Sequence, residues 1–236
     1  TNCIKFVYKV IFIYYIFMHK IVQNLIDIQN KINLHINEHK IDKVPKIIAV
    51  SKTFKIEKIL PLVDHGHKDF GENKVQEAVD KWTEIKLSNP SIQLHLIGRL
   101  QTNKVKFAVK IFDYIHSVDS KKLAQKISDE QNKINKKIKI FIQVNIGQED
   151  QKSGINENEL NSLISYCSEI NLDVVGLMCI PPMNEDSATY FEKMKKLNKE
   201  SNFYELSMGM SSDYLKAAIN NASYLRIGSS IFGERY

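Results

Sequence analysis

Two kinds of hydrophobic pattern alternate along the 236 residues of the chain. Short segments rich in Ile, Val and Leu are bounded by Gly, Pro or polar residues, which is typical of buried strands. Between them lie longer segments whose apolar residues recur every three or four positions, the period of an amphipathic helix. The first helical stripe covers 21–36, and strands are predicted at 46–50, 69–71, 92–97, 112–116, 138–146, 174–180, 204–208 and 224–227.

Regular alternation of strands and helices predicts a parallel sheet, because each strand must return to the same end through a helix. Eight such units in a chain of this length favour a closed (β/α)8 TIM barrel, a fold that commonly takes about 250 residues. A doubly wound open sheet is the alternative. Since no low-complexity linker divides the sequence, we expect one domain over residues 18–236.

The first seventeen residues differ from the rest. Segment 4–17 is apolar and aromatic, but Lys5 and Lys9 interrupt it, and it is shorter than the about 20 apolar residues of a membrane span. No small-residue cleavage site of a signal peptide follows it. Because Met18 stands directly before the first helical stripe, we expect the native protein to begin there and residues 1–17 to be non-native or disordered. N-terminal mass spectrometry of the native protein tests this expectation.

Composition narrows the classes of function. The chain is 43% hydrophobic and 25% charged with a net charge of +6, as an ordinary globular protein can be. Its lysines are scattered, which favours a solvated surface over nucleic-acid or membrane binding and leaves an anionic small ligand open. Cys3, Cys167 and Cys179 lack the short spacings of a zinc site or disulfide framework, so we expect a cytoplasmic protein without a metal.

Polar side chains occupy one face of two predicted strands. In 138–146 the isoleucines share one face and Gln143 and Asn145 the other, because side chains alternate along a strand. His95 stands in the same relation to its leucine neighbours. If the apolar faces pack beneath the helices, these polar groups point into the barrel. There they serve a ligand or satisfy one another, and the sequence leaves both interpretations open.

Three segments at strand ends carry candidate chemistry. Lys52 directly follows the strand 46–50, and a lysine in a partly apolar barrel mouth can lose its proton and attack an aldehyde. Ser207–Ser211 and Arg226–Ser230 are rich in small residues, which leaves backbone N–H groups and hydroxyls available to an anion. Phosphate sites in such barrels typically use the loops after strands seven and eight. The simpler interpretation is that both segments are tight turns.

A series of short motifs runs in order from about Met18 to Tyr236. They are Ala49–Thr53, Phe70–Asn73 with Val75–Glu77, His95–Gly98, Leu100–Lys104, His116–Asp119, Gln143–Asn145, Gly176–Met178, Ser207–Ser211 with Asp213, and Arg226–Gly228 through Phe232–Gly233. Together they resemble the pyridoxal phosphate homeostasis protein family. Each piece alone is a weak signal, but the combination is specific.

The resemblance implies a barrel of the alanine racemase N-terminal domain type that holds pyridoxal 5′-phosphate (PLP). On that basis Lys52 forms a Schiff base with the PLP aldehyde. Ser211, Gly228 and Ser229 are implied as the phosphate-binding residues, and Asn73 is implied beside the cofactor ring.

The resemblance also places Arg226 at the pyridine nitrogen of PLP. A guanidinium cannot accept a hydrogen bond and disfavours a second positive charge nearby. It therefore leaves the ring largely unprotonated and weakens the capacity of the cofactor to draw electrons. One departure from the family pattern is Arg99, where we expect His. We expect it to change only the local loop, outside the phosphate contacts.

These features favour PLP storage and delivery within PLP homeostasis over robust catalysis, with apo PLP-dependent enzymes as recipients. Only eight residues follow Gly228, so we expect no second domain of the kind that supplies an acid–base tyrosine in alanine racemase. A PLP-dependent amino-acid racemase is one alternative. Another is a cofactor-free aldolase in which Lys52 attacks a sugar phosphate directly. We also expect a monomer.

Overall fold

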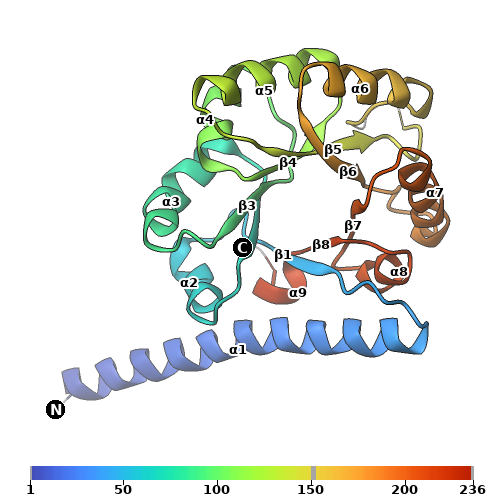
Figure 1. Ribbon diagram of the computed structural model, residues 1–236. Helices are drawn as coiled ribbons and strands as arrows, with labels where there is room; N and C mark the ends of the chain where they lie inside the picture. The colour runs from blue at the N-terminus through green and yellow to red at the C-terminus, as the bar shows by residue number, and fades with distance from the viewer. Residues whose placement is uncertain (1, 150–152, 235–236) are drawn as a thin grey trace.

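The computed structural model describes residues 2–149 and 153–234, with side chains from Lys20 onward. Within these residues, eight parallel strands close into a barrel in sequence order, and β1 pairs with β8 (Figure 1). The predicted (β/α)8 barrel is thereby confirmed, and the doubly wound alternative is wrong. The strands are β1 (Lys46–Val50), β2 (Asp69–Glu72), β3 (Gln93–Leu96), β4 (Tyr114–Val118), β5 (Lys139–Val144), β6 (Asp173–Cys179), β7 (Glu205–Met210) and β8 (Tyr224–Ile227).

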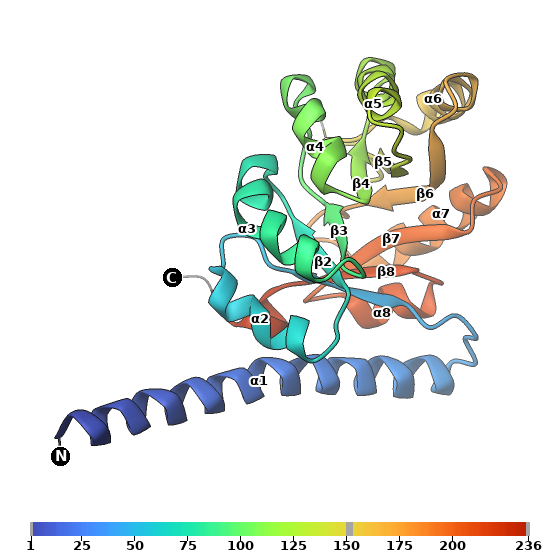
Figure 2. The same cartoon turned by 60° about the vertical axis from the view of Figure 1, so that its left-hand side comes forward.

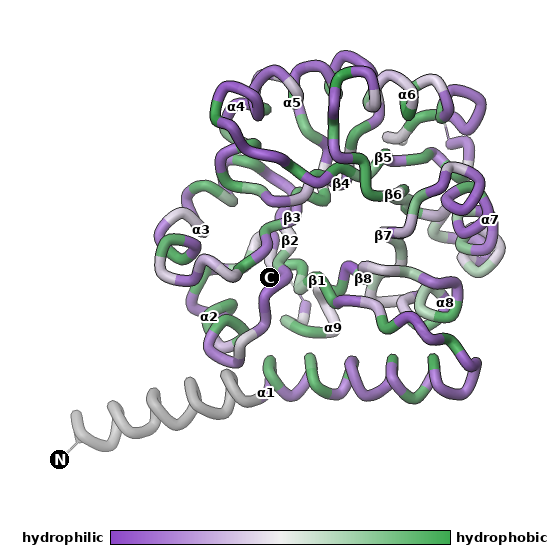
Figure 3. Tube along the Cα trace, in the orientation of Figure 1, coloured by the Kyte–Doolittle hydropathy of each residue, from purple (hydrophilic) through white to green (hydrophobic). Residues whose placement is uncertain are grey.

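Helices surround the barrel, because a parallel strand pair needs a crossover connection and a helix supplies it. Hydrophobic positions recur along these helices between hydrophilic ones (Figure 3), so each helix can turn one face to the sheet. The helices are α1 (Asn2–Glu38), α2 (Ile56–Asp64), α3 (Val75–Ser88), a 3₁₀ turn η1 (Thr102–Lys104), α4 (Val105–Ile111), α5 (Lys121–Lys133), α6 (Glu157–Glu169), α7 (Ser187–Glu200), α8 (Tyr214–Ile219) and α9 (Ser229–Phe232).

Helix α1 lies across the outside of the barrel, against α2, α8 and α9 (Figures 1 and 2). The stripe predicted for it is confirmed, since all five of its apolar residues are buried: Ile21, Leu25, Ile28, Ile32 and Ile36. The helix begins at Asn2, well before the predicted start. Over the described part of the chain, none of the helices has both the length and the hydropathy to cross a bilayer.

The buried apolar side chains form two layers. The larger layer lies between the strands and the helices and includes Ile140 and Ile142 of β5. The smaller layer fills the barrel interior and includes Phe141 from the opposite face of the same strand. The predicted assignment of the two faces of this strand is therefore confirmed. The other buried members of the inner layer are Ile48, Val50, Tyr114, Met178 and Tyr224.

Six of the eight predicted strands differ from the structure by one or two residues at an end, and β4 and β7 are the two that bear on the argument. Strand β4 begins at Tyr114 rather than at residue 112, because the backbone N–H of Phe112 bonds to the carbonyl of Ala108 and completes the last turn of α4. Strand β7 continues to Met210. Gly209 and Met210 consequently belong to the strand rather than to the loop after it, and Ser207, within the predicted strand, is completely buried.

Candidate functional site

A cavity of about 590 Å³ lies at the carboxyl ends of the strands. In a parallel barrel this end gathers the loops that follow every strand, and ligand sites of such barrels are found there. Residues 52 and 226, from the first and last strands, share this cavity. All six residues predicted for the site line it: Lys52, Asn73, Ser211, Arg226, Gly228 and Ser229.

The segment that carries Lys52 is held in place on both sides by a partly buried cluster of the charged residues Glu72, Glu77 and Lys81. Ser51 Oγ donates to Glu72 Oε1 (2.7 Å), and the backbone N–H of Thr53 donates to Glu77 Oε1 (2.6 Å). Lys81 Nζ joins the two carboxylates, at 2.9 Å from each, and donates to the carbonyl of Ser51 at 3.0 Å. Because Ser51 and Thr53 are both hydrogen-bonded to this cluster, the backbone at Lys52 is fixed where it leaves β1.

No role was predicted for Glu72, Glu77 or Lys81 from the sequence. Glu72 is completely buried although it is an acidic residue, and a buried carboxylate requires a partner. Glu77 and Lys81 are four residues apart and so lie on one face of α3. Burial would raise the pKa of Glu77, but Lys81 and the Thr53 N–H lower it below its usual value. The sequence does show an acidic residue at a strand end and a Glu–Lys pair four residues apart, but it does not show that Glu72 is buried or that it contacts Lys81.

Asn73 follows β2 and lines the cavity. Its side-chain Oδ1 is buried, and no described protein group donates a hydrogen bond to it. Leaving such an acceptor unpaired costs about 1–3 kcal/mol, so a donor from a bound ligand or water is expected at this point. The neighbouring Gly98 is required by space, because a Cβ there would lie 2.4 Å from the Asn73 carbonyl oxygen.

The loops after β7 and β8 contribute Ser211, Gly228 and Ser229 to the lining of the cavity. Ser211 Oγ accepts a hydrogen bond from the backbone N–H of Ser230 at 3.5 Å. Gly228 precedes the first turn of α9, and a Cβ on it would lie 3.3 Å from the Val50 carbonyl oxygen, so a larger residue would crowd β1. First-turn N–H groups of a helix lack intrahelical acceptors and suit an anion. The residues present fit a phosphate group.

Arg226 is buried, with only 4% of its surface exposed, and it reaches the cavity from the barrel interior. Its Nη1 donates to Ser207 Oγ (2.7 Å) and its Nη2 donates to the Cys179 carbonyl (2.8 Å). Burial lowers the pKa of the guanidinium, but arginine is not deprotonated in proteins, so the group keeps its charge. Leu225 and Ile227 pack in the outer core, as the predicted alternation requires.

Three other polar residues noted in the sequence, Gln143, Asn145 and Arg99, differ in position and hydrogen bonding. Gln143 lines the cavity and donates to the Ser153 carbonyl at 3.0 Å. Asn145 instead holds the following loop, through paired hydrogen bonds with the backbone of Glu149. Arg99 is exposed and lines the cavity, so the departure from the family pattern lies closer to the site than expected.

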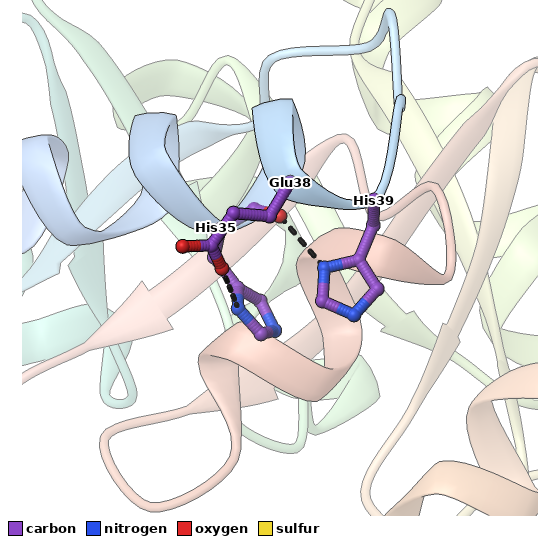
Figure 4. Close-up of side chains that lie close together, drawn as sticks. All are labelled: His35, Glu38 and His39. Carbon is purple, nitrogen blue, oxygen red and sulfur yellow. Dashed lines mark hydrogen bonds and ion pairs between the residues drawn. The ribbon is translucent and has the colours of Figure 1, made fainter.

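A separate cluster lies at the exposed end of α1. His35, Glu38 and His39 bring their side chains together there (Figure 4), with potential ligand atoms within 4.8 Å of one another. The ring Nδ1 of His39 donates to the His35 carbonyl (2.9 Å), and His35 Nδ1 lies 3.7 Å from Glu38 Oε2. These contacts stabilise the helix end, so the arrangement is explained without a ligand.

A family model and several curated relatives match most of this chain. The family model described as "Alanine racemase, N-terminal domain" matches residues 26–236. The pyridoxal phosphate homeostasis protein of Pasteurella multocida is 36% identical over 227 residues, covering 91% of this chain and 97% of the relative. The protein of the same name from Aquifex aeolicus is 40% identical over 200 residues, covering 80% and 87% respectively.

Solved structures agree with these sequence comparisons. PipY of Synechococcus elongatus PCC7942 without PLP is 31% identical with a TM-score of 0.77, covering 86% of this chain and 100% of PipY. The structure of PipY with PLP bound has a TM-score of 0.75. Alanine racemase of Clostridium difficile 630, at 16% identity and a TM-score of 0.65, shares the fold, and this chain covers 57% of it. The chain therefore belongs to the pyridoxal phosphate homeostasis protein family.

Proposed function

We propose that the protein binds PLP as a Schiff base on Lys52 and serves PLP homeostasis by storing the cofactor and delivering it to apo PLP-dependent enzymes. Ser211, Gly228 and Ser229 hold the phosphate in this proposal, Arg226 faces the pyridine nitrogen and Asn73 lies beside the ring. PLP has been seen bound to the related PipY. The supporting observation is that residues from four separate strand ends line one cavity of about 590 Å³.

The chemistry asked of the protein is an exchange of amines at a carbonyl carbon. Lys52 Nζ would hold the aldehyde carbon through a C=N bond, formed with the loss of one water. Hydrolysis would return the free aldehyde, and exchange with another amine would transfer the C=N bond to that amine, so either route regenerates the amine of Lys52. PLP itself supplies the reactive aldehyde and an electron-withdrawing ring. The cluster around Glu72 and Lys81 keeps the Lys52 segment in position throughout.

The position of Arg226 supports a role in carrying PLP rather than in PLP-dependent catalysis. Its guanidinium can only donate hydrogen bonds, so it does not stabilise a proton on a facing ring nitrogen. The ring then draws electrons less strongly than one paired with a carboxylate. A carrier benefits from this, because a bound amino acid undergoes fewer side reactions.

Borohydride trapping tests the proposal at residue level. Purified protein incubated with PLP should acquire visible absorbance that borohydride abolishes, and peptide mass spectrometry should then find a reduced PLP adduct on Lys52. Lys52→Ala should lose the adduct and retain its circular dichroism spectrum. Lys55→Ala, which removes an exposed lysine three residues away, should keep it. An undiminished adduct in Lys52→Ala would overturn the assignment.

Delivery and catalysis are separated by two further measurements. The loaded protein should restore activity to an apo PLP-dependent enzyme faster than Lys52→Ala mixed with the same PLP. Exchange of amino-acid α-protons in heavy water would instead identify a racemase. Colourless protein that borohydride traps only with a sugar phosphate would identify an aldolase.

A further inference from the structure

A continuous chain of hydrogen-bonded side chains crosses the barrel interior below the candidate site. Asp69 Oδ1 lies 3.1 Å from His95 Nε2, and His95 Nδ1 lies 3.0 Å from His116 Nε2. His116 Nδ1 lies 2.8 Å from Ser207 Oγ, which accepts from Arg226 Nη1 at 2.7 Å. The five members come from β2, β3, β4, β7 and β8.

The two terminal residues of this series of hydrogen bonds, Asp69 and Arg226, lie at opposite ends of the barrel. Arg226 lines the cavity at the carboxyl ends of the strands. Asp69 is the first residue of β2 and lines a second cavity of about 480 Å³, which also contains Lys46 and His67 and borders α1. His95, His116 and Ser207, between them, are completely buried. The chain therefore connects a carboxylate at the base of the barrel with the guanidinium at the candidate site.

The donors and acceptors of the chain fix its direction. An ionised carboxylate only accepts, so His95 donates to Asp69 through Nε2–H. A neutral His95 then accepts at Nδ1 from His116 Nε2–H, and a neutral His116 accepts at Nδ1 from the Ser207 hydroxyl. Ser207 in turn accepts from Arg226, which only donates. Each of the four bonds has one hydrogen, and every hydrogen points from Arg226 toward Asp69.

The surroundings of both imidazoles support this neutral arrangement. The Tyr114 ring stacks on His95 (centroids 4.3 Å apart), and the Phe141 ring stacks on His116 (4.4 Å). Burial lowers the pKa of His95, and it lowers the pKa of His116 well below the usual value. Burial would raise the pKa of Asp69, but its hydrogen bond with His95 lowers it. The chain thus has an anion at one end, a cation at the other and two neutral rings between.

We propose that Asp69, His95, His116 and Ser207 form a positioning relay, which fixes the orientation of the Arg226 guanidinium toward the cavity. A carboxylate at the base of the barrel thereby helps to set the environment of the cofactor's pyridine nitrogen. None of the four residues lines the cavity that Arg226 lines, so they act through Arg226. The inference rests on the proposed function, because it takes Arg226 as the residue facing that nitrogen.

Nitrogen-15 NMR of histidine-labelled protein without added PLP tests the relay itself. In the unsubstituted protein, His95 and His116 should both be neutral Nε2–H tautomers at neutral pH. Asp69→Asn replaces an obligate acceptor by an amide that can donate or accept, so the tautomer preference of both rings should weaken. The decisive signal is His116, whose ring hydrogen-bonds to His95 and Ser207 rather than to residue 69.

A matched control is His67→Gln. His67 Nε2 bonds to the backbone carbonyl of Asp69 at 2.9 Å, so this variant removes a neighbouring imidazole and leaves the relay side chains in place. The His116 signals should stay unchanged. The relay is refuted if His116 is protonated or an Nδ1–H tautomer in the unsubstituted protein, or if Asp69→Asn leaves its signals unaltered.

The second test measures PLP binding by Ser207 variants, so it does not require Asp69→Asn to fold. Ser207→Ala deprives Arg226 of an acceptor, so the dissociation constant for PLP should rise about tenfold and the pH dependence of the visible absorbance should shift. Ser207→Thr keeps a hydroxyl and should restore both. Unchanged affinity and spectrum in Ser207→Ala would overturn the relay while leaving the proposed function intact. Absence of PLP binding in the unsubstituted protein would overturn the proposed function and leave the tautomer result standing.

Discussion

At the scale of single residues, His95 and His116 couple the stability of the fold to pH. Both are completely buried, and burial lowers both pKa values. In the unfolded chain a histidine has a pKa of about 6.5. Below that pH the unfolded chain binds protons that the folded barrel does not, which favours unfolding.

The free energy of unfolding should therefore be constant above about pH 7.5 and should decrease as the pH falls below about 6.5. The slope should approach about 1.4 kcal/mol per pH unit from His116, whose pKa lies well below the usual value, and His95 should add to it. Urea unfolding across this range measures it. His116→Gln should reduce the slope, and His65→Gln, at an exposed position, should leave it unchanged. Equal stability at about pH 7.5 and 5.5 would contradict the expectation.

At the scale of elements, the junction of β7 and α8 depends on one glycine. Gly209 has φ = 87°, and a Cβ on it would lie 2.5 Å from Ala217 Cβ of α8 and 3.0 Å from Leu225 Cδ2 of β8. The pairing register of β7 and β8 shifts in the same segment, between Ser207 and Met210. The glycine thus lets the strand approach its helix just before the loop that holds Ser211.

Gly209→Ala should destabilise the fold more than Gly66→Ala. Both positions have positive φ, at 87° and 88°, but a Cβ at Gly66 would meet nothing within 4 Å. Backbone strain alone should cost about 1–2 kcal/mol, and the clash at Gly209 should add about 1–3 kcal/mol. Denaturant unfolding of the two variants separates the cost of backbone strain, which both share, from the cost of the clash at Gly209. Equal losses would show that α8 can move away.

The same junction shows where prediction from the sequence ends. Strand positions and the two faces of β5 were predictable, because alternating side chains report burial directly. The small residues around Gly209 were predicted to end the strand at residue 208, whereas the structure continues it to Met210 with a local irregularity. The contacts of Glu72 with Lys81, and of His116 with Ser207, depend on how helices and strands pack and align. Such contacts leave no periodic trace in the sequence.

Within the site, the residues that line the cavity could be predicted from the sequence, but the residues that hold them in position could not. Lys52 and Arg226 could be placed because each stands at or near a strand end, and strand ends converge in a barrel. Asn145 was expected in the barrel mouth and instead bonds to its own loop. Alternation gives the face of a residue and does not give its hydrogen-bond partner.

At the scale of the whole molecule, α1 joins elements from both ends of the sequence. It packs on α2, α8 and α9, and Asn24 Nδ2 donates to the Ile231 carbonyl of α9 at 2.8 Å. Helix α9 directly follows Gly228, a predicted phosphate-binding residue. The first helix therefore supports the last loop of the site.

Ile32→Ala in α1 should lower the free energy of unfolding by about 3 kcal/mol, because it leaves a cavity in the core. Ile32 is 0% exposed, whereas Leu34, two residues on, is 64% exposed. Leu34→Ala should change stability by less than about 0.5 kcal/mol. Denaturant unfolding compares the two variants. A small effect at Ile32 would show that α1 contributes little to the barrel.

The pairing of β1 with β8 has a consequence for synthesis on the ribosome. Lys52 is translated early, while the strand that completes its surroundings begins only at Tyr224. A nascent chain arrested before that point has an open sheet edge and no Gly228–Ser229 loop, so it lacks two of the residues proposed to hold the phosphate. Under the proposed function, the capacity to bind the vitamin B6 aldehyde arises late in translation, when the ring of strands closes.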